Sequence, residues 1–214
     1  MNTDSKLKII NAKLVNEGNV FDGEILIVND RIYKIGSQIE VEGECEIYDA
    51  NGNYVLPGLI DDQVHFREPG LTHKATIATE SKAALAGGIT SFIEMPNTLP
   101  QTTTIEEWET KNKRAADTSF ANYAFMFGGT NDNLEEILAL DTKRVPALKL
   151  FLGSSTGNML VDNPDVLRKI FSNTDLVIAV HCEDEGTIRA NMQKAVEIYG
   201  EDIPMSQHPI IRSE

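Results

Sequence analysis

Short apolar runs alternate with turn residues in the first part of the chain. Residues 24–28 and 31–35 are two such runs, and Asn29 with Asp30 lies between them. Two apolar runs joined by a two-residue polar turn are typical of a β-hairpin. The pattern predicts a small, β-sandwich-like N-terminal domain over residues 1–56.

The pattern changes at about residue 57, where strand-length apolar runs begin to alternate with segments of helical periodicity. Helix signals support the segmentation: Asn163 and Pro164 are favoured at the start of a helix, and Gly200 at its end. The predicted elements, in chain order, are strand 55–65, helix 72–85, strand 89–95, helix 104–115, strand 121–127, helix 134–138, strand 147–152, helix 163–171, strand 175–181 and helix 188–199.

Strict alternation of strands and helices predicts a parallel sheet with helices outside it, in the α/β class. An open doubly wound sheet and a (β/α)8 barrel both fit, but no glycine-rich nucleotide loop follows the first strand, which favours the barrel. A complete barrel has eight units and about 250 residues. Residues 57–214 hold only five units, so we expect a partial TIM barrel that is the N-terminal part of a longer protein.

Composition narrows the possible partners. The chain has 214 residues and a formal net charge of −14, so nucleic acid and anionic membranes are not expected partners. Its two cysteines do not suggest a disulfide framework, and neither a signal sequence nor a transmembrane segment is apparent. These features predict a cytoplasmic protein.

Polar residues cluster where the predicted strands end, which is where ligands bind in parallel α/β folds. Asp61, Gln63, His65 and Arg67 alternate along the first strand. Residues two apart share a face of a strand, so all four side chains should project together if the strand continues to Arg67. Asn97 follows the second strand.

Strands four and five carry two further polar groups. Lys149 lies between apolar residues, and burying an ammonium group without a partner is costly, so something must pair with the amine or change it chemically. His181 and Glu183 share a face at the end of strand five. Each group alone has a structural explanation as a hydrogen-bonded or ion-paired side chain. Together they favour a metal or anion site.

Several of these segments resemble motifs of the dihydroorotases, which are cyclic amidohydrolases of the amidohydrolase superfamily. The most specific is Phe-Arg-Glu-Pro-Gly at residues 66–70, because it separates dihydroorotases from most hydantoinases and allantoinases. The other matching segments are 57–65, 95–98, 148–151 and 180–183. The resemblance extends over essentially the whole chain.

The resemblance implies a role for each matching residue. His65 and His181 would bind zinc, with one or two ions in the site. Lys149 would be carboxylated and would bridge the metals. Arg67 and Asn97 would hold the substrate carboxylate, a task that suits the planar donor fork of arginine.

Two departures from the family pattern matter. Gln63 stands where the family has a histidine ligand, and a neutral amide is a poor zinc ligand beside imidazole. Asp61 would support the ligands from behind. The strand-six histidine and the strand-eight aspartate that shuttles protons would lie beyond residue 214, so this piece alone should be inactive.

The implied activity is zinc-dependent, reversible hydrolysis of dihydroorotate to N-carbamoyl-aspartate in pyrimidine biosynthesis. One alternative is another cyclic amidohydrolase, an allantoinase or hydantoinase, although Arg67 would then have no carboxylate to bind. A second alternative is a catalytically inactive scaffold, which Gln63 favours. We also expect a homo-oligomer for the full-length protein, with a transcarbamoylase as a further partner.

Overall fold

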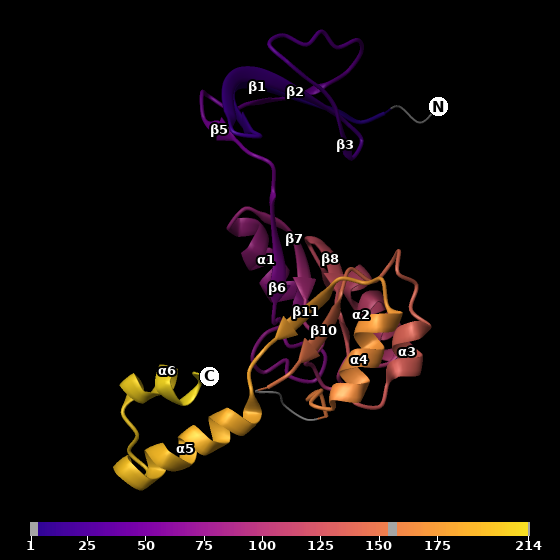
Figure 1. The fold of residues 1–214 in the computed structure, drawn as a ribbon. Coiled ribbons are helices and arrows are strands. Elements are labelled where there is room, and N and C mark those ends of the chain that lie inside the picture. The colour runs from indigo at the N-terminus through magenta and orange to yellow at the C-terminus, as the bar shows by residue number, and fades with distance from the viewer. Residues whose placement is uncertain (1–3, 154–157, 214) are drawn as a thin grey trace. The chain divides into compact units, whose positions relative to one another are not determined.

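The computed structural model describes residues 4–153 and 158–213. The chain divides into two units, Met1–Gly58 and Leu59–Glu214. Figure 1 shows β strands alone in the first unit and alternating strands and helices in the second. No helix in the described part of the chain is long and apolar enough to cross a membrane, and Cys45 and Cys182 are both free thiols.

All strands described in the first unit belong to one mixed sheet, in the order β3-β2-β1-β4, with β5 beside β1. The first three strands form an antiparallel meander, and β4 and β5 run parallel to β1. Val28 pairs with Arg31, which confirms the predicted hairpin and its two-residue turn. The strands are β1 (Lys6–Asn16), β2 (Asn19–Val28), β3 (Arg31–Gly36), β4 (Glu46–Asp49) and β5 (Tyr54–Val55).

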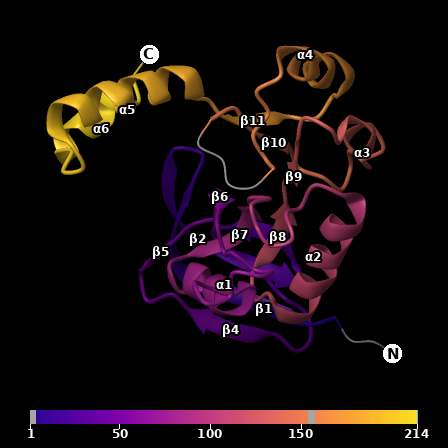
Figure 2. The same ribbon diagram turned by 90° about the horizontal axis from the view of Figure 1, so that it is seen from below.

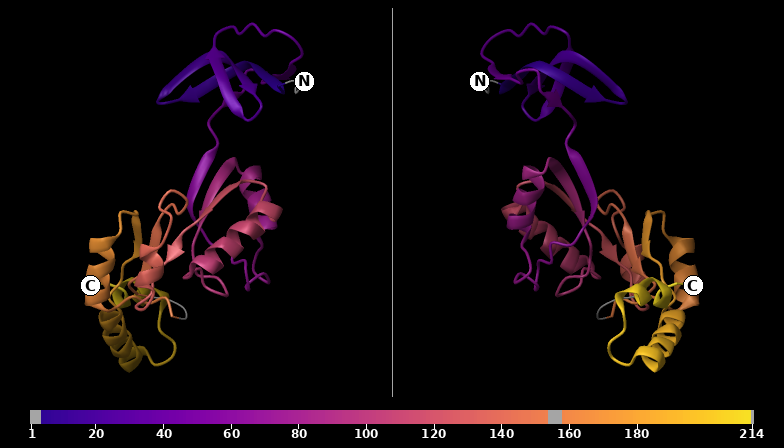
Figure 3. Two further views of the ribbon diagram at one scale, coloured as in Figure 1. Left: turned by 90° about the vertical axis from the view of Figure 1, so that its right-hand side faces the viewer. Right: turned by 90° about the vertical axis from the view of Figure 1, so that its left-hand side faces the viewer.

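The long strand β1 is bent, and the bend gives the sheet a concave side. Its pairing with β2 is irregular between Ile9 and Ala12, where Asn11 has a φ of 53°. A bulge of this kind increases local twist and curls the sheet, as Figure 3 shows. Beyond the bend, Ala12 and Leu14 alternate with exposed residues and form a small apolar core with β2.

Among the described residues of the second unit, all strand pairs are parallel, as the alternating pattern predicted. The strands form two sets of neighbours, β6-β7-β8 and β11-β10-β9. Met126 alone separates β8 from β9, so the chain passes directly from one set to the other. The strands are β6 (Leu59–Val64), β7 (Ile89–Glu94), β8 (Asn122–Phe125), β9 (Phe127–Gly128), β10 (Leu148–Phe151) and β11 (Ile178–His181).

Helices follow the strands at the predicted places. Thr104 caps α2 by accepting the Glu107 N–H, and Asn163 caps α4, with Pro164 in its first turn. Helix α1 starts later than residue 72, because Thr76 and Thr79 form a reciprocal capping box at its actual start. The helices are α1 (Ile77–Ala86), α2 (Ile105–Thr118), α3 (Leu134–Leu138), α4 (Pro164–Asn173), α5 (Glu185–Tyr199), the 3-10 turn η1 (Met205–Gln207) and α6 (His208–Ile211).

The strands of this unit have two different faces. One face packs against the helices through a large apolar cluster that includes Phe92, Leu148 and Leu150. A smaller cluster, which includes Met95 and Ala147, lies on the opposite face. Figure 2 shows α1 and α2 beside the first set of strands and α3 and α4 beside the second.

Helix α5 ends at Gly200, as predicted, but its apolar face is only partly covered. Ala195 is buried, whereas Met192, Val196 and Tyr199 are 42%, 46% and 40% exposed. The periodicity therefore predicted the helix correctly, but not its burial in the described structure.

Candidate active site

Strand β6 includes Asp61 and Gln63 but ends before His65 and Arg67. The strand stops at Val64, and its pairing with β7 is irregular between Asp61 and Val64. Arg67 has a φ of 71°, which is a left-handed and not an extended conformation. The prediction that the strand continues to Arg67, and that alternation alone aligns four side chains, is therefore wrong. The site at this strand end is built by a loop.

The first two polar residues of the predicted set lie close together in the chain but do different things. The Asp61 carboxylate accepts the backbone N–H of Gln63 at 3.1 Å. Asp61 therefore stabilises its own strand end. The Gln63 side chain is exposed and has no partner among the described residues.

His65 and Asn97 are brought together from the ends of β6 and β7. His65 Nδ1 lies 2.8 Å from Asn97 Oδ1. Because a carbonyl oxygen only accepts, this contact places the proton on Nδ1 and leaves the Nε2 lone pair free. Burial lowers the pKa of His65, the Asn97 hydrogen bond raises it, and the charges of Arg67 and Lys149 lower it further. The lowered pKa favours the neutral imidazole, which is the form that binds metals.

The loop over residues 67–70 is fixed by contacts on both sides. Glu68 is buried, and its carboxylate accepts the Ile77 N–H at 2.8 Å and a donor of Arg114 at 3.1 Å. The Pro69 carbonyl accepts the Leu99 N–H at 3.1 Å. Gly70 has a φ of 82°, and a Cβ there would lie 2.0 Å from the Leu99 carbonyl oxygen. Only glycine fits at this point, and the loop is bound tightly to the segment after β7.

Lys149 is the second residue of β10 and is 3% exposed. Two residues from Ala147, it shares the strand face of the smaller apolar cluster. Its Nζ lies 5.2 Å from the centre of the Phe151 ring, and no carboxylate of the described residues pairs with it. Burial lowers the pKa of the Lys149 amine, which favours the neutral amine.

His181 ends β11, next to β10. It pairs in register with Phe151, two residues after Lys149, so both polar groups lie on the same side of neighbouring strands. His181 Nε2 donates to the Glu183 carboxylate at 2.7 Å. Glu183 is held in turn by Arg212, whose Nε donates to it at 2.6 Å. This arrangement leaves His181 Nδ1 free and resembles the carboxylate support of metal-binding histidines.

The predicted residues thus form two groups that approach each other. His65 and Asn97 are in direct contact, and Lys149 and His181 lie on adjacent strands. When the Lys149 amine is protonated, its charge lowers the pKa of His65. Within residues 4–153 and 158–213, no three His, Cys, Asp or Glu side chains form a metal cluster.

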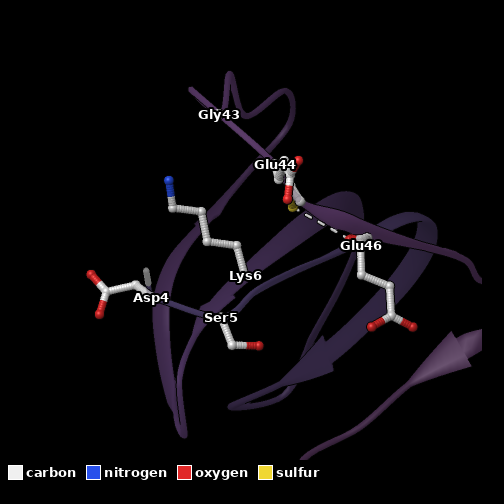
Figure 4. A pocket seen from close by; sticks show the side chains of 7 residues that line it. Asp4, Ser5, Lys6, Gly43, Glu44 and Glu46 are labelled. Carbon is white, nitrogen blue, oxygen red and sulfur yellow. Dashed lines mark hydrogen bonds between the residues drawn. The ribbon is translucent and has the colours of Figure 1, made fainter. Parts of the chain in front are cut away.

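A different hollow lies in the first unit (Figure 4) and contains none of the predicted residues. Lys6 Nζ, on one side of it, donates to the Glu42 carbonyl at 2.7 Å. Cys45 Sγ donates to the Glu46 carbonyl at 3.3 Å. Both side chains are hydrogen-bonded to nearby backbone carbonyls.

Sequence reasoning missed the residues that hold the site together. Glu68 and Arg114 anchor the loop, and Glu94, which ends β7, accepts the Arg67 N–H at 3.0 Å. The sequence pattern places Glu183 on the same face as His181, but no pattern indicates that Arg212 contacts Glu183. All of these contacts except His181–Glu183 join residues far apart in the chain, so no local pattern marks them.

Residues 52–200 match the family model described as dihydro-orotase-like. The chain is 36% identical over 183 residues to a dihydroorotase of Methanosarcina acetivorans, covering 84% of this chain and 39% of that protein. It is 37% identical over 191 residues to a dihydroorotase of Ehrlichia chaffeensis, covering 85% and 42%. The chain thus spans about two fifths of the length of these relatives.

The fold also matches solved structures. The L-hydantoinase (dihydropyrimidinase) from Arthrobacter aurescens superposes with a TM-score of 0.90 at 27% identity, covering 99% of this chain and 47% of that one. A D-hydantoinase from a Thermus species gives a TM-score of 0.75 at 27% identity, covering 97% and 46%. These likenesses confirm the predicted partial-barrel fold of the α/β class. The extent of the family match and the identity to its relatives show that the chain belongs to the dihydro-orotase-like family.

Proposed function

We propose that the intact protein containing this chain is a dihydroorotase, which hydrolyses the ring amide of dihydroorotate to N-carbamoyl-aspartate and catalyses the reverse reaction. The observation that carries the proposal is the fixed loop at residues 66–70, which keeps Arg67 beside the His65–Asn97 pair. A guanidinium group suits the carboxylate of dihydroorotate, because its donor fork can bind both oxygens.

Asn97 would assist Arg67 at the same end of the substrate. Its Oδ1 is engaged by His65, whereas Nδ2 has no partner among the described residues. An amide N–H can donate to a carboxylate oxygen. Asn97 would therefore orient His65 with one atom and the substrate with the other.

The residues present suit a zinc site, and we propose one or two zinc ions. The lone pairs on His65 Nε2 and His181 Nδ1 are free, and the buried Lys149 amine has no counterion among the described residues. A neutral amine reacts with CO2 to give a carbamate and releases a proton, and the carbamate would supply anionic oxygen ligands. Bound zinc would polarise the ring carbonyl and lower the pKa of an attacking water.

Gln63 is the weak point of the proposed site. Its amide would replace an imidazole ligand, so one metal position should bind zinc less tightly than the other. The aspartate that shuttles protons is expected in the remainder of the intact protein, beyond residue 214.

The proposal is tested with the intact protein loaded with zinc. Ring opening of dihydroorotate is followed by the appearance of N-carbamoyl-aspartate, with hydantoin and allantoin as comparison substrates. Preference for dihydroorotate, lost on chelation and restored by zinc, is the expected result. Turnover of hydantoin in preference to dihydroorotate would favour the hydantoinase alternative, which the fold likeness to L-hydantoinase supports.

An intact, zinc-loaded protein that turns over none of these rings would support the inactive scaffold, the reading that Gln63 favours. The domain boundary after residue 56, the cytoplasmic location, the homo-oligomer and the transcarbamoylase partner stay predictions.

A further inference from the structure

A buried ion pair lies behind the candidate site, on the face of the strands that the helices cover. Glu94 ends β7, and Lys111 lies in the middle of α2. Their exposed fractions are 0% and 1%, and Lys111 Nζ is 3.0 Å from Glu94 Oε2. Lys111 also donates to the Met95 carbonyl at 3.1 Å and lies 4.9 Å from the centre of the Phe125 ring.

A buried ion pair contributes little net stability to the packing of a helix on a sheet, because both charges lose their hydration. Burial raises the pKa of Glu94 and lowers the pKa of Lys111. The attraction between the two opposes both shifts, and backbone hydrogen bonds from Arg67 and Phe66 also oppose the shift of Glu94. Apolar side chains of similar volume often stabilise a protein as much as a buried pair does, or more. Attachment of α2 to β7 therefore does not by itself account for the charges.

The other carboxylate oxygen of Glu94 reaches the candidate site. Glu94 Oε1 accepts the backbone N–H of Arg67 at 3.0 Å. Arg67 has a φ of 71°, a left-handed conformation that is unfavourable for a residue with a side chain. This hydrogen bond stabilises Arg67 in that conformation, while Lys111 holds the carboxylate that accepts it.

We propose that Glu94 and Lys111 are positioning residues, which fix the backbone of Arg67 and so aim its guanidinium at the substrate carboxylate. The inference rests on the proposed function, because it assigns the aim of Arg67 to substrate binding. It adds that the backbone of Arg67 is held by residues on the helix-covered side of the sheet. Neither Glu94 nor Lys111 touches the substrate in this account.

Two double substitutions in the intact protein separate positioning from a purely structural role. Glu94→Gln with Lys111→Met removes both charges but keeps a side-chain oxygen for the Arg67 N–H. Glu94→Met with Lys111→Met removes the charges and the acceptor. Both variants leave the Met95 carbonyl without its lysine donor, so each is the matched control for the other.

The expected result is a KM for dihydroorotate at least about 10-fold higher in Glu94→Met/Lys111→Met than in Glu94→Gln/Lys111→Met, with kcat values within about 3-fold. Loss of the carboxylate that accepts the Arg67 N–H is expected to change KM by a factor of this order. Equal KM values in two folded variants would overturn the proposal. If the methionine pair does not fold, Glu94→Asp, which withdraws the oxygens by one methylene group, should raise KM similarly.

A measurement without substrate separates this inference from the proposed function. Hydrogen exchange of the Arg67 amide should be at least about 10-fold faster in Glu94→Met/Lys111→Met than in Glu94→Gln/Lys111→Met, with exchange in the core of β10 unchanged. Equal protection of the Arg67 amide would contradict positioning even in an active enzyme. The exchange difference would support the positioning of Arg67 even if dihydroorotate proved not to be the substrate.

Discussion

Replacing Gly70 with alanine tests whether the loop at residues 67–70 is held as tightly as the contacts indicate. Gly70 has a φ of 82°, and an alanine in this conformation lowers the free energy of unfolding by about 1–2 kcal/mol. A Cβ would also lie 2.0 Å from the Leu99 carbonyl oxygen. The loop must then move, and the 3.1 Å hydrogen bond from the Leu99 N–H to the Pro69 carbonyl is lost. This loss lowers the free energy of unfolding by about 0.5–1.5 kcal/mol more.

Gly88→Ala is the matched control. Gly88 has a φ of 85°, but nothing lies within 4 Å of a Cβ added there. Gly88→Ala should lower the free energy of unfolding only by the conformational contribution, about 1–2 kcal/mol. Denaturant unfolding of the two intact, metal-stripped variants should therefore show that Gly70→Ala is less stable by about 0.5–1.5 kcal/mol.

The kinetic consequence should differ even more. Gly70→Ala displaces the loop that carries Arg67, so its KM for dihydroorotate should rise, whereas that of Gly88→Ala should not. Equal losses of stability together with equal KM values would refute the claim that the fit of Gly70 against Leu99 sets the loop.

Three further substitutions in the intact protein test single residues. Arg67→Ala should fold normally and raise KM for dihydroorotate by about 10- to 100-fold, the value of a charged hydrogen-bonded contact; an unchanged KM would remove Arg67 from the binding site. Gln63→His should raise the zinc content measured by elemental analysis, and an unchanged content would show that residue 63 is not a ligand position. Lys149→Met should stabilise the metal-stripped protein by about 1–3 kcal/mol at pH 7. Because burial lowers the folded-state pKa of Lys149, the folded state binds fewer protons, and the wild-type protein should gain stability relative to Lys149→Met as pH rises toward about 10.4. A difference independent of pH would contradict this.

The alternating architecture was predictable because its signals are local. The hairpin turn at Asn29 and Asp30, the caps at Thr104 and Asn163, and the end of α5 at Gly200 are each encoded in a few neighbouring residues. Strand–helix alternation then implied a parallel sheet. The comparison with hydantoinase structures confirms this fold.

The end of β6 was not predictable in the same way, and the start of α1 was predictable only in part. Helix α1 begins at Ile77, whose N–H is accepted by the Glu68 carboxylate from across the loop. Strand β6 ends at Val64 because its pairing with β7 is irregular and the following loop is bound elsewhere. The start of α1 has a local signal in the Thr76–Thr79 capping box, whereas its contact with Glu68 and the end of β6 depend on other segments.

One half of the Glu94–Lys111 pair, Lys111, is indicated by the sequence pattern. Lys111 lies three residues after Trp108 and four before Ala115, and both of those residues are buried. A lysine at this spacing lies on the apolar face of the helix, which requires a buried acidic partner. Nothing in the sequence identifies that partner as Glu94, because α2 and β7 meet only in the fold.

The central claim is that His65, Lys149 and His181 together hold zinc next to Arg67. Anomalous diffraction at the zinc edge, from crystals of the intact zinc-loaded protein, tests it most directly. The account predicts a peak about 2.0–2.1 Å from His65 Nε2 or His181 Nδ1, with density for a carboxylated Lys149 beside it. Zinc bound elsewhere, with an unmodified Lys149 in a fully active enzyme, would contradict it.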